Sequence, residues 1–503
     1  MLTGVVIPET TSTQFVHLLT TSTQLSAALV ALTATVVGAV PTLEIKGSDF
    51  VVPKDGTKFE IVGMAYQPGG SSGYDPAHGK DPLSNADVCL RDAALMQVLG
   101  VNAIRVYNVN PDINHDECAS IFNAAGMYMM IDVNSPRVGE AISSFEPWTT
   151  YYAAYLNRTF AVVEAFANYP NTLLFFSGNE IINDIESAKE VPPYMRAVTR
   201  DLKNYIKNNI KRQIPVGYSA ADVREVLWDT YNYVTCAIDG KEDDVSRADL
   251  FALNSYSWCG KDATFKSSTF DKLVDGLKES PVPTFFSEYG CIETKERWWN
   301  ETKSIYGPDM YDTFSGGVVY EWTLEENGYG LVKIEDSQTT LQADYNRLKD
   351  KYSDLDWETI FKRKAGDSSN KPVKCSSSLI TEEGFKNNFT LPAVPPGASE
   401  LIKDGIKKKP SGKIVEIKNW KTSLKVVDNT GNAINDLKVV PLGDDEFNYY
   451  GKNKVTTGTT SGNSSSTTSA DSASKTDAGN SAVGLSMPMV WSVAVPLLAM
   501  LFI

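Results

Sequence analysis

Residues 172–180, TLLFFSGNE, form a continuous apolar run that ends in a polar cluster. Continuous apolar runs of this length indicate strands that are buried on both faces, as in a parallel sheet. The pattern occurs eight times between residues 58 and 322. The other seven runs are FEIVGMAYQ (from Phe59), VNAIRVYNV (Val101), MYMMIDVN (Met127), IPVGYSAAD (Ile214), LFALNSYSW (Leu250), VPTFFSEYG (Val282) and GGVVYEWT (Gly316).

Longer amphipathic stretches separate several of these runs. In residues 192–210, PPYMRAVTRDLKNYIKNNI, one helical face carries Met195, Val198, Leu202, Tyr205 and Ile206, with Lys and Arg opposite. Eight strand and helix units within roughly 260 residues have the size and rhythm of a (β/α)8 barrel. We therefore predict an α/β fold, a (β/α)8 TIM barrel over residues 43–345 with a smaller, mainly β or irregular C-terminal module.

The ends of the predicted strands are unusually polar. In such barrels the C-terminal ends of the strands build the active site. One polar residue there could simply be a hydrogen-bonded strand cap, but all eight runs carry them, which favours an active-site cleft. The residues are Tyr66, Gln67, Tyr107, Asp132, Asn134, Asn179, Glu180, Asp222, Asn254, Tyr256, Glu288, Tyr289, Tyr320 and Glu321.

The composition of the 503 residues excludes several classes of function. Lys+Arg 47 against Asp+Glu 62 gives a net charge of −15, which would repel a phosphate backbone, so no nucleic-acid partner is expected. The three histidines, His17, His78 and His115, are too scattered for a metal site or a Ser/His/Asp triad. We expect neither metal nor cofactor. An aromatic content of 10% suits a protein that stacks rings on an uncharged sugar.

Among the carboxylates at the strand ends, Glu180 in the fourth run and Glu288 in the seventh are the candidate catalytic pair. Such a pair is the equipment for cleaving a glycosidic bond, with one carboxyl protonated and the other ionised. Tyrosine hydroxyls can hold a neighbouring carboxylate ionised, which favours Glu288 as the nucleophile and Glu180 as the acid/base. We expect a separation of about 5 to 5.5 Å, the retaining geometry. Asn179 can hydrogen-bond the sugar 2-hydroxyl.

Both ends of the chain carry segments typical of export. Residues 25–40, LSAALVALTATVVGAV, predict a signal peptide over residues 1–39, although residues 1–24 contain no Lys or Arg; the alternative is a buried apolar helix. Residues 456–479 predict a Ser/Thr-rich stalk. Residues 480–503 predict a GPI signal tail that is removed, with Gly479 or Asn480 as the attachment residue. The alternative, a transmembrane helix, would have only 15 residues from Met489 to Ile503, short of the ~20 required.

The six cysteines predict three disulfides in an exported chain, with 15 possible pairings, and the absence of a CxxC pair argues against zinc. Sequons at Asn157, Asn300 and Asn388 are the expected glycosylation sites, and a further sequon begins at Asn463 in the stalk. We interpret residues 346–455 as the C-terminal module, held on the barrel by Cys375. A loosely attached linker is the alternative.

A set of motifs resembles one known family. YQPGGSSGYDP (from Tyr66), NAIRVYNVNPDINHDEC (Asn102), FFSGNEIIND (Phe175), IPVGYSAAD, LNSYSWCG (Leu253), FFSEYGC (Phe285) and FSGGVVYEW (Phe314) are together similar to the fungal β-1,3-glucanosyltransferases of glycoside hydrolase family 72. The resemblance implies cleavage within a β-1,3-glucan chain, a covalent glycosyl-enzyme, and transfer to the non-reducing end of another glucan. It implies glucan donor and acceptor chains as partners, elongation of wall glucan, and a monomer anchored to the outer face of the plasma membrane by a GPI lipid.

The resemblance also implies roles for individual residues. The acid/base falls on Glu180 and the nucleophile on Glu288, as the strand-end argument gives. Pairing in the family implies the disulfides Cys89–Cys118, Cys236–Cys375 and Cys259–Cys291. With one cysteine after Cys291, the chain resembles the shorter subgroup that lacks a cysteine-rich glucan-binding module. Substrate contacts are expected from Tyr107, Asn134, Asn179, Asp222, Arg224 and Tyr320, with Gln67, Asp132 and Tyr256 as further candidates.

Two alternatives remain open. The first is an endo-β-1,3-glucanase that releases its intermediate to water. The second is a catalytically impaired wall protein that binds glucan. Transfer requires an acceptor held at high effective concentration, for which Tyr256, Trp258, Tyr320 and Trp322 are expected stacking platforms, whereas Trp298 and Trp299 are expected to pack the barrel rim.

Overall fold

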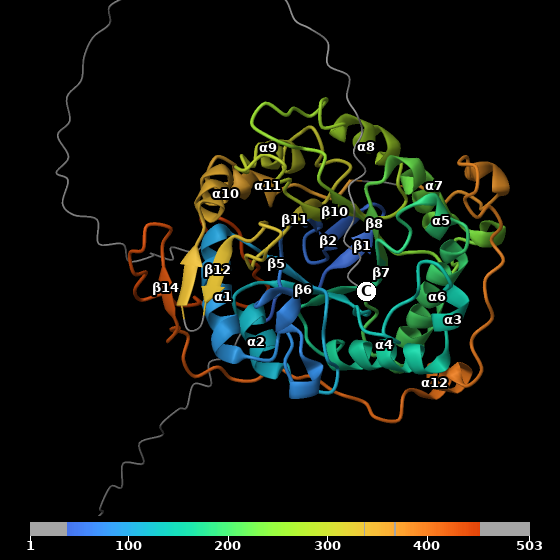
Figure 1. Ribbon diagram of the computed structural model, residues 1–503, viewed down its shortest axis with the longest axis horizontal. Coiled ribbons are helices and arrows are strands. Elements are labelled where there is room, and N and C mark those ends of the chain that lie inside the picture. Colours follow the sequence, from blue (N-terminus) through green and yellow to red (C-terminus); the bar gives the residue numbers. More distant parts are fainter. Residues whose placement is uncertain (1–37, 336–337, 367–368, 453–503) are drawn as a thin grey trace, which may run out of the picture. The chain divides into compact units, whose positions relative to one another are not determined.

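The computed structural model describes residues 38–335, 338–366 and 369–452. Its centre is a closed barrel of eight parallel strands, in the order β10-β11-β4-β5-β6-β7-β8-β9 (Figure 1). Each strand lies within one of the eight predicted runs, which confirms the TIM barrel. The strands are β4 (Ile61–Ala65), β5 (Ala103–Val106), β6 (Tyr128–Asp132), β7 (Thr172–Asn179), β8 (Val216–Ala221), β9 (Phe251–Ser255), β10 (Thr284–Tyr289) and β11 (Gly316–Val319).

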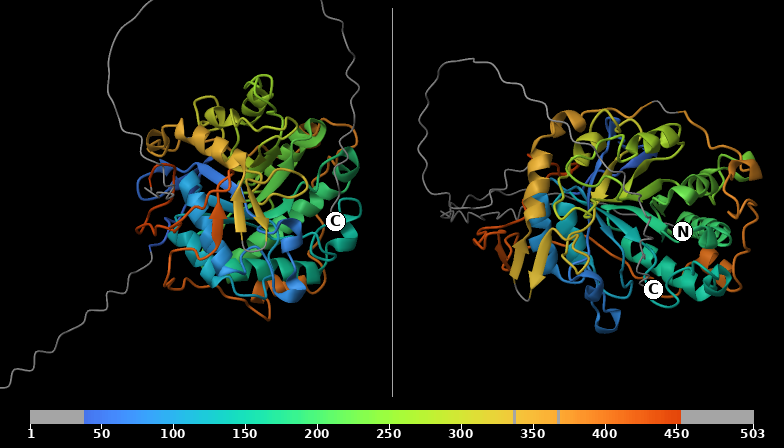
Figure 2. Two further views of the ribbon diagram at one scale, coloured as in Figure 1. Left: turned by 60° about the vertical axis from the view of Figure 1, so that its left-hand side comes forward. Right: turned by 45° about the horizontal axis from the view of Figure 1, so that its top comes forward.

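Helices surround the barrel (Figures 1 and 2). In α6, prolines occupy the first turn, where their missing N–H groups cost nothing, and the five residues of the predicted apolar face are all buried. The main helices are α1 (Ala86–Leu99), α2 (Asp116–Ala124), α4 (Ala153–Phe166), α6 (Val191–Asn209), α7 (Arg224–Thr235), α8 (Phe270–Leu277), α9 (Glu301–Ile305) and α10 (Ala343–Ser353). Shorter ones are α3 (Pro147–Thr150), α5 (Ile185–Ala188), α11 (Trp357–Ile360), α12 (Ala398–Asp404) and 3-10 turns at Gly70–Gly73, Pro76–His78, Ile238–Gly240 and Ser377–Leu379.

The barrel interior changes from apolar to polar along its axis. Successive side chains of a strand point to opposite faces, so residues two apart share the interior. Ala103, Tyr128 and Ala252 belong to the apolar cluster inside the barrel. Two residues further along β5 and β9, Arg105 and Asn254 are hydrogen-bonded to each other. The sequence therefore places apolar side chains nearer the N-terminal ends of the strands and a polar layer at their C-terminal ends.

Two small sheets lie outside the barrel. Before it, β1 (Glu44–Lys46), β2 (Asp49–Val52) and β3 (Thr57–Lys58) form an antiparallel sheet, and Phe50 of β2 packs on Phe285 of β10 with ring centroids 6.0 Å apart. After it, β12 (Val332–Glu335) pairs with β13 (Gln338–Leu341), and β13 pairs with β14 (Lys425–Val427). The first sheet thus covers the end of the barrel where the strands begin.

Residues 354–366 and 369–452, within the range predicted as a C-terminal module, follow the outside of the barrel as a largely irregular segment that we call the C-terminal strap (Figures 1 and 2). Its helix α12 packs on α6 and α4, and its strand β14 completes the sheet with β13. The predicted boundary at residue 345 falls inside α10, which packs against α1 and α9. The strap is therefore attached at separate points along the barrel.

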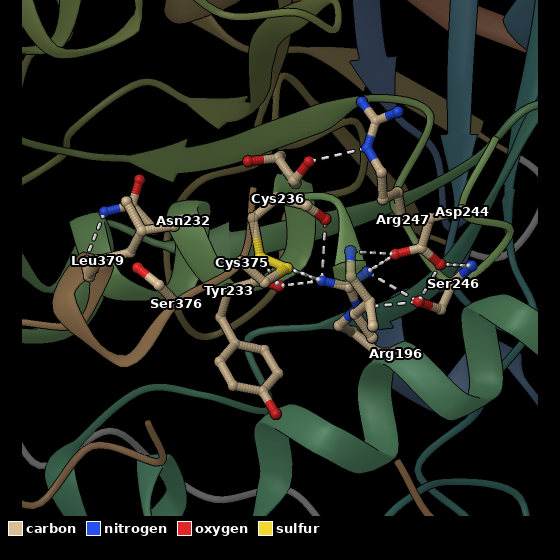
Figure 3. Close-up of a disulfide and its surroundings, with 12 residues drawn as sticks. Arg196, Asn232, Tyr233, Cys236, Asp244, Ser246, Arg247, Cys375, Ser376 and Leu379 are labelled. Atoms are coloured by element: carbon tan, nitrogen blue, oxygen red, sulfur yellow. Dashed lines mark hydrogen bonds and ion pairs between the residues drawn. A yellow bond between two sulfur atoms is a disulfide. The ribbon is translucent and has the colours of Figure 1, made fainter. Parts of the chain in front are cut away.

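Three disulfides are present, with the pairing that the family resemblance implies. Cys89–Cys118 joins α1 to α2, and Cys259–Cys291 joins the loops after β9 and β10. Cys236–Cys375 joins the end of α7 to the strap. Beside it, the buried Arg196 contacts both sulfurs at 3.4 Å and pairs with Asp244 (Figure 3).

The predicted signal peptide, stalk and GPI tail, with Asn480, lie outside the described residues. Within the described part, no helix is long and apolar enough to cross a bilayer. Asn157 on α4 and Asn388 on the strap are exposed, as glycosylation requires. Asn300 is half-buried, and its Nδ2 donates to the carbonyl oxygen of Lys261 at 3.0 Å.

Candidate active site

Irregularities at two strand ends place Glu180 and Glu288 at the barrel mouth. The register of β10 against β9 shifts between Phe286 and Glu288, so Ser287 and Glu288 both reach interior partners. A comparable shift ends β7, and Glu180 follows it with φ 50, in the left-handed region that residues other than glycine seldom adopt. Both carboxyls thus leave the regular alternation of their strands.

Three donors contact the carboxylate of Glu288. Its Oε1 accepts from the Tyr107 hydroxyl at 2.9 Å and from Arg105 Nη1 at 3.2 Å, and its Oε2 accepts from the Tyr256 hydroxyl at 2.5 Å. Burial raises the pKa of Glu288 to about 7, Arg105 lowers it, and the charge of Glu180 raises it. The predicted tyrosine donors are therefore present, but burial outweighs them.

Glu180 has one such donor. Its Oε1 accepts from Asn254 Nδ2 at 2.9 Å. Burial raises the pKa of Glu180, opposed by the Asn254 hydrogen bond and the charge of Arg105, in agreement with the expected environment of a general acid. The two carboxyls are connected through Asn254 and Arg105, because Arg105 Nη1 donates to Asn254 Oδ1 at 3.2 Å and to Glu288 Oε1.

Arg105 is the centre of this network, and the sequence reasoning did not select it. The side chain is fully buried between the rings of Tyr107 and Phe176, 4.5 and 4.7 Å from their centroids. Burial disfavours the charged guanidinium, but Asp132, Tyr107 and Glu288 together outweigh this effect and leave the pKa of Arg105 above its usual value. A charged residue inside the apolar run VNAIRVYNV, two positions after Ala103 on the same face, was the available signal.

Asp132 and Asn179 both face Arg105. Nε and Nη2 of Arg105 lie 3.1 and 3.3 Å from the two carboxylate oxygens of Asp132, so Asp132 holds the arginine. The Oδ1 atom of Asn179 accepts from Arg105 Nη2 at 2.7 Å, from Ser219 at 2.8 Å and from Asn254 at 3.0 Å. These three bonds do not use the amide nitrogen of Asn179, the group that could donate to a sugar hydroxyl.

The other predicted contact residues lie in the loops around this network. Asn134 is held at both ends, since its Nδ2 donates to the Ser177 carbonyl at 2.9 Å and its Oδ1 accepts from Tyr155 at 2.7 Å. Gln67 is buried and donates to the Gly70 carbonyl at 3.3 Å. Asp222 forms an ion pair with Arg224.

Tyrosines, and not tryptophans, form the aromatic part of the mouth. The ring of Tyr320 lies edge-on to those of Tyr107 and Tyr256, with centroids 6.4 and 6.2 Å apart. Tyr329, which sequence reasoning missed, lies 5.2 Å from Tyr320 and 5.5 Å from Tyr256. It comes after Asn327 and Gly328 in the turn that follows the last barrel strand.

The expectation that Trp258 and Trp322 offer stacking platforms is wrong, because both are buried, with 7% and 0% of their surface exposed. Trp258 packs on Phe270 and Trp322 on Tyr345. Trp299 is buried as expected, and Trp298 is half-buried beneath Lys261.

Glu321 supplies a further buried carboxyl at the end of β11. Its Oε1 accepts from Asn327 Nδ2 at 2.7 Å. Burial raises the pKa of Glu321 to about 8, and the Asn327 hydrogen bond opposes this. Near neutral pH it therefore adds little negative charge to the mouth.

Comparisons with known proteins agree with this geometry. A family described as glucanosyltransferase matches residues 32–356. The 1,3-beta-glucanosyltransferase gel2 of Aspergillus fumigatus is 49% identical over 432 residues, 86% of this chain and 89% of the relative. The probable 1,3-beta-glucanosyltransferase GAS3 of Saccharomyces cerevisiae is 43% identical over 406 residues, 77% of each chain. A solved structure of a Saccharomyces cerevisiae Gas2p mutant in complex with laminaritetraose and laminaripentaose has a TM-score of 0.62 and 31% identity, covering 71% of this chain and 75% of that one.

Proposed function

This chain belongs to the glucanosyltransferase family, glycoside hydrolase family 72, and from that premise we propose that it cleaves a β-1,3-glucan chain and transfers the new end to another glucan. The observation that carries the proposal is the pair of strand-end carboxyls, joined through Asn254 and Arg105. Transfer to the non-reducing end of the acceptor would elongate wall glucan.

The proposed reaction is a retaining double displacement. The Glu288 carboxylate attacks the anomeric carbon, while Glu180 gives its proton to the departing glycosidic oxygen. The products of this step are a glycosyl ester on Glu288 and a shortened glucan. In the second step, Glu180 takes the proton of an acceptor hydroxyl, whose oxygen forms the new glycosidic bond and releases Glu288. This mechanism requires the carboxyl groups of Glu180 and Glu288 to lie about 5 to 5.5 Å apart.

The donors around the pair fit these roles. Arg105, Tyr107 and Tyr256 all place hydrogen-bond donors on Glu288, which stabilises it as an ion before attack and as a leaving group afterwards. Glu180 receives one amide donor, and burial raises its pKa, which favours the protonated form that a general acid needs. Asn179 is proposed to donate its amide N–H to the sugar 2-hydroxyl.

The wider substrate contacts are proposed on the loops of the same barrel end. Gln67, Tyr107, Asn134, Asp222, Arg224, Tyr256 and Tyr320 are the proposed contacts, whereas Asp132 would act by holding Arg105. Water is present at about 55 M, so transfer depends on an acceptor held at high effective concentration. Tyr256, Tyr320 and Tyr329 offer the rings against which an acceptor could stack.

The cellular setting is proposed from the sequence of the two termini. We place the protein in the secretory pathway and on the outer face of the plasma membrane, as a monomer held by a GPI lipid at Asn480. Asn157, Asn300 and Asn388 are the proposed glycosylation sites.

Incubation of the purified protein with a reduced laminari-oligosaccharide tests the proposed activity. Products longer than the input are expected, and their loss in both Glu180→Gln and Glu288→Gln is the matched control. Shorter products alone would identify a hydrolase. Intact glucan binding without any product from the wild type would identify a binding protein.

A further inference from the structure

Exposed large hydrophobic side chains are concentrated in one segment. Among the described residues, five such side chains are exposed, and four of them lie between residues 138 and 152. The exposed fractions are 95% for Val138, 61% for Phe145, 51% for Trp148 and 38% for Tyr152, and the fifth, Val373 at 60%, is on the strap. We call residues 138–152 the aromatic ledge. A cluster of this kind on a soluble surface marks a binding site more often than scattered single residues do.

The first half of the aromatic ledge is fixed to its surroundings by Arg158 of α4. The guanidinium pairs with Glu140 at 2.8 Å. It also donates to the carbonyl oxygens of Val133 at 2.6 Å and Val109 at 2.9 Å, so that it joins the loops after β6 and β5. This part of the aromatic ledge is therefore held by the same side chain that fixes the neighbouring loop.

The second half is fixed by hydrogen bonds of its own. The backbone N–H of Ser143 donates to Thr150 Oγ1 at 2.9 Å, which closes the segment around Phe145 and Trp148. The buried Tyr151 donates to Asp201 and accepts from Arg200 at 2.9 Å, both on α6. Rings presented on a fixed backbone lose little conformational freedom when a ligand stacks on them.

The position of the aromatic ledge links it to the candidate active site. It begins four residues after Asn134, at the end of β6, on the barrel end that carries Glu180 and Glu288. Its helix α3, which carries Trp148, packs against α6 in the ring of helices around the barrel (Figure 1). Loops at this end of the barrel surround the mouth, and the aromatic ledge belongs to one of them, so a polymer that extends beyond its reacting bond could pass over it.

The charge of the aromatic ledge favours an uncharged ligand. Residues 138–152 contain Glu140 and Glu146 and no lysine or arginine. Glu140 is already paired with Arg158, and the whole chain has a net charge of −15. An anionic lipid surface attracts basic segments, so this composition fits a neutral sugar polymer better than a membrane.

We propose that the aromatic ledge binds glucosyl units of a β-1,3-glucan chain remote from the cleaved bond, with Phe145 and Trp148 as stacking platforms. This inference rests on the proposed function and adds a selection for chain length to it. Long glucans reach the aromatic ledge, whereas short oligosaccharides occupy only the mouth. The aromatic ledge contributes the same binding free energy in the enzyme–substrate complex and in the transition state. It therefore lowers KM for long chains without changing kcat.

The test is the double variant Phe145→Ala/Trp148→Ala, with Val373→Ala as the matched control for an exposed apolar residue elsewhere. Kinetics are measured on a long soluble β-1,3-glucan and on the shortest laminari-oligosaccharide that the wild type elongates. We expect KM for the long glucan to rise about tenfold with kcat unchanged, and the short substrate and the control to behave as wild type. Unchanged KM on both substrates, or an equal loss on both, would overturn the proposal.

Two further measurements separate the other outcomes. Reduced binding to vesicles of phosphatidylcholine and phosphatidylserine, with unchanged glucan kinetics, would show a membrane contact and overturn the proposal. If the wild type elongates nothing, the proposed function fails, and retention on insoluble β-1,3-glucan still tests the aromatic ledge. Retention that is lost in the double variant and kept in Val373→Ala supports it, and retention that is absent in the wild type or equal in all three contradicts it.

Discussion

The mouth of the barrel and the C-terminal strap are built in opposite ways. At the mouth, strand ends bring Arg105, Asn254 and Glu288 into one buried hydrogen-bond network, in which each group depends on the others. The strap has little regular structure and is joined to the barrel at separate points, among them Cys375 and Asn448. Changes at the mouth should therefore alter the catalysed reaction, whereas changes in the strap should alter stability and leave the reaction intact.

The largest expected effect is the loss of activity in Glu288→Gln. The amide cannot form the glycosyl ester, so transfer should fall by about 10⁴-fold or more. The substitution keeps the volume and a hydrogen-bonding group, so the midpoint of thermal unfolding should change little. A rate assay beside a thermal melt checks both. If the midpoint of thermal unfolding of Glu288→Gln fell as far as that of a strap variant, the mouth and the strap would not differ in their effect on stability.

The disulfide between Cys236 and Cys375 should show the reverse behaviour. It closes a loop with a sequence separation of 139, and its removal in Cys236→Ser/Cys375→Ser should lower the free energy of unfolding by about 2 to 5 kcal/mol. The kcat and KM of the folded variant should equal those of the wild type. Denaturant unfolding and kinetics test this.

Cys89→Ser/Cys118→Ser is a comparison variant, since its loop has a sequence separation of only 29 and its loss should cost about 1.4 kcal/mol less. A strap variant that stays folded but loses kcat would contradict the separation of roles.

A smaller loss of stability is expected from Asn448→Ala. This buried side chain of the strap donates from Nδ2 to the carbonyl oxygens of Gln97 at 3.2 Å and Val101 at 2.9 Å. Its removal leaves buried acceptors without these donors, at a cost of about 1 to 3 kcal/mol. The exposed Asn387→Ala is the matched control, with an expected change within about 0.5 kcal/mol. Equal effects in the two variants would show that the contact does not attach the strap.

The smallest effect is a shift of the pH profile in Tyr256→Phe. Burial raises the pKa of Glu288 to about 7, and the Tyr256 hydrogen bond lowers it, so removal of the hydroxyl should raise it further. Because the attack needs the ionised form, activity is lost as the pH falls through this pKa, and the acidic limb of kcat/KM should move to higher pH. Tyr329→Phe is the control. A limb that moves to lower pH in Tyr256→Phe would contradict the assignment.

The barrel strands could be predicted because a strand that is buried on both faces requires a continuous apolar run, as in TLLFFSGNE. Glu180 and Glu288 followed as candidates because they end such runs. Arg105 was missed because its partners come from β6, β7, β9 and β10, and only closure of the barrel brings them together.

The predictions failed for residues in the loops that follow the strands and in the strap. Trp258 and Trp322 were expected at the mouth, yet in the loops the alternation of faces is lost and both rings turn into the core. The contacts of Asn448 with Gln97 and Val101 span 351 and 347 residues, and no local pattern in the strap indicates them.

Trapping of the glycosyl-enzyme would show which of the two glutamates forms the covalent bond to the sugar. The Glu180→Gln variant would be incubated with a laminari-oligosaccharide glycoside of an activated phenol, a leaving group that needs no acid. Because the second step still needs the missing base, the ester should accumulate, and peptide mass spectrometry should place one glycosyl chain on Glu288. A glycosyl chain on any other residue, or the absence of an adduct while the phenol is released as a single burst, would contradict the account.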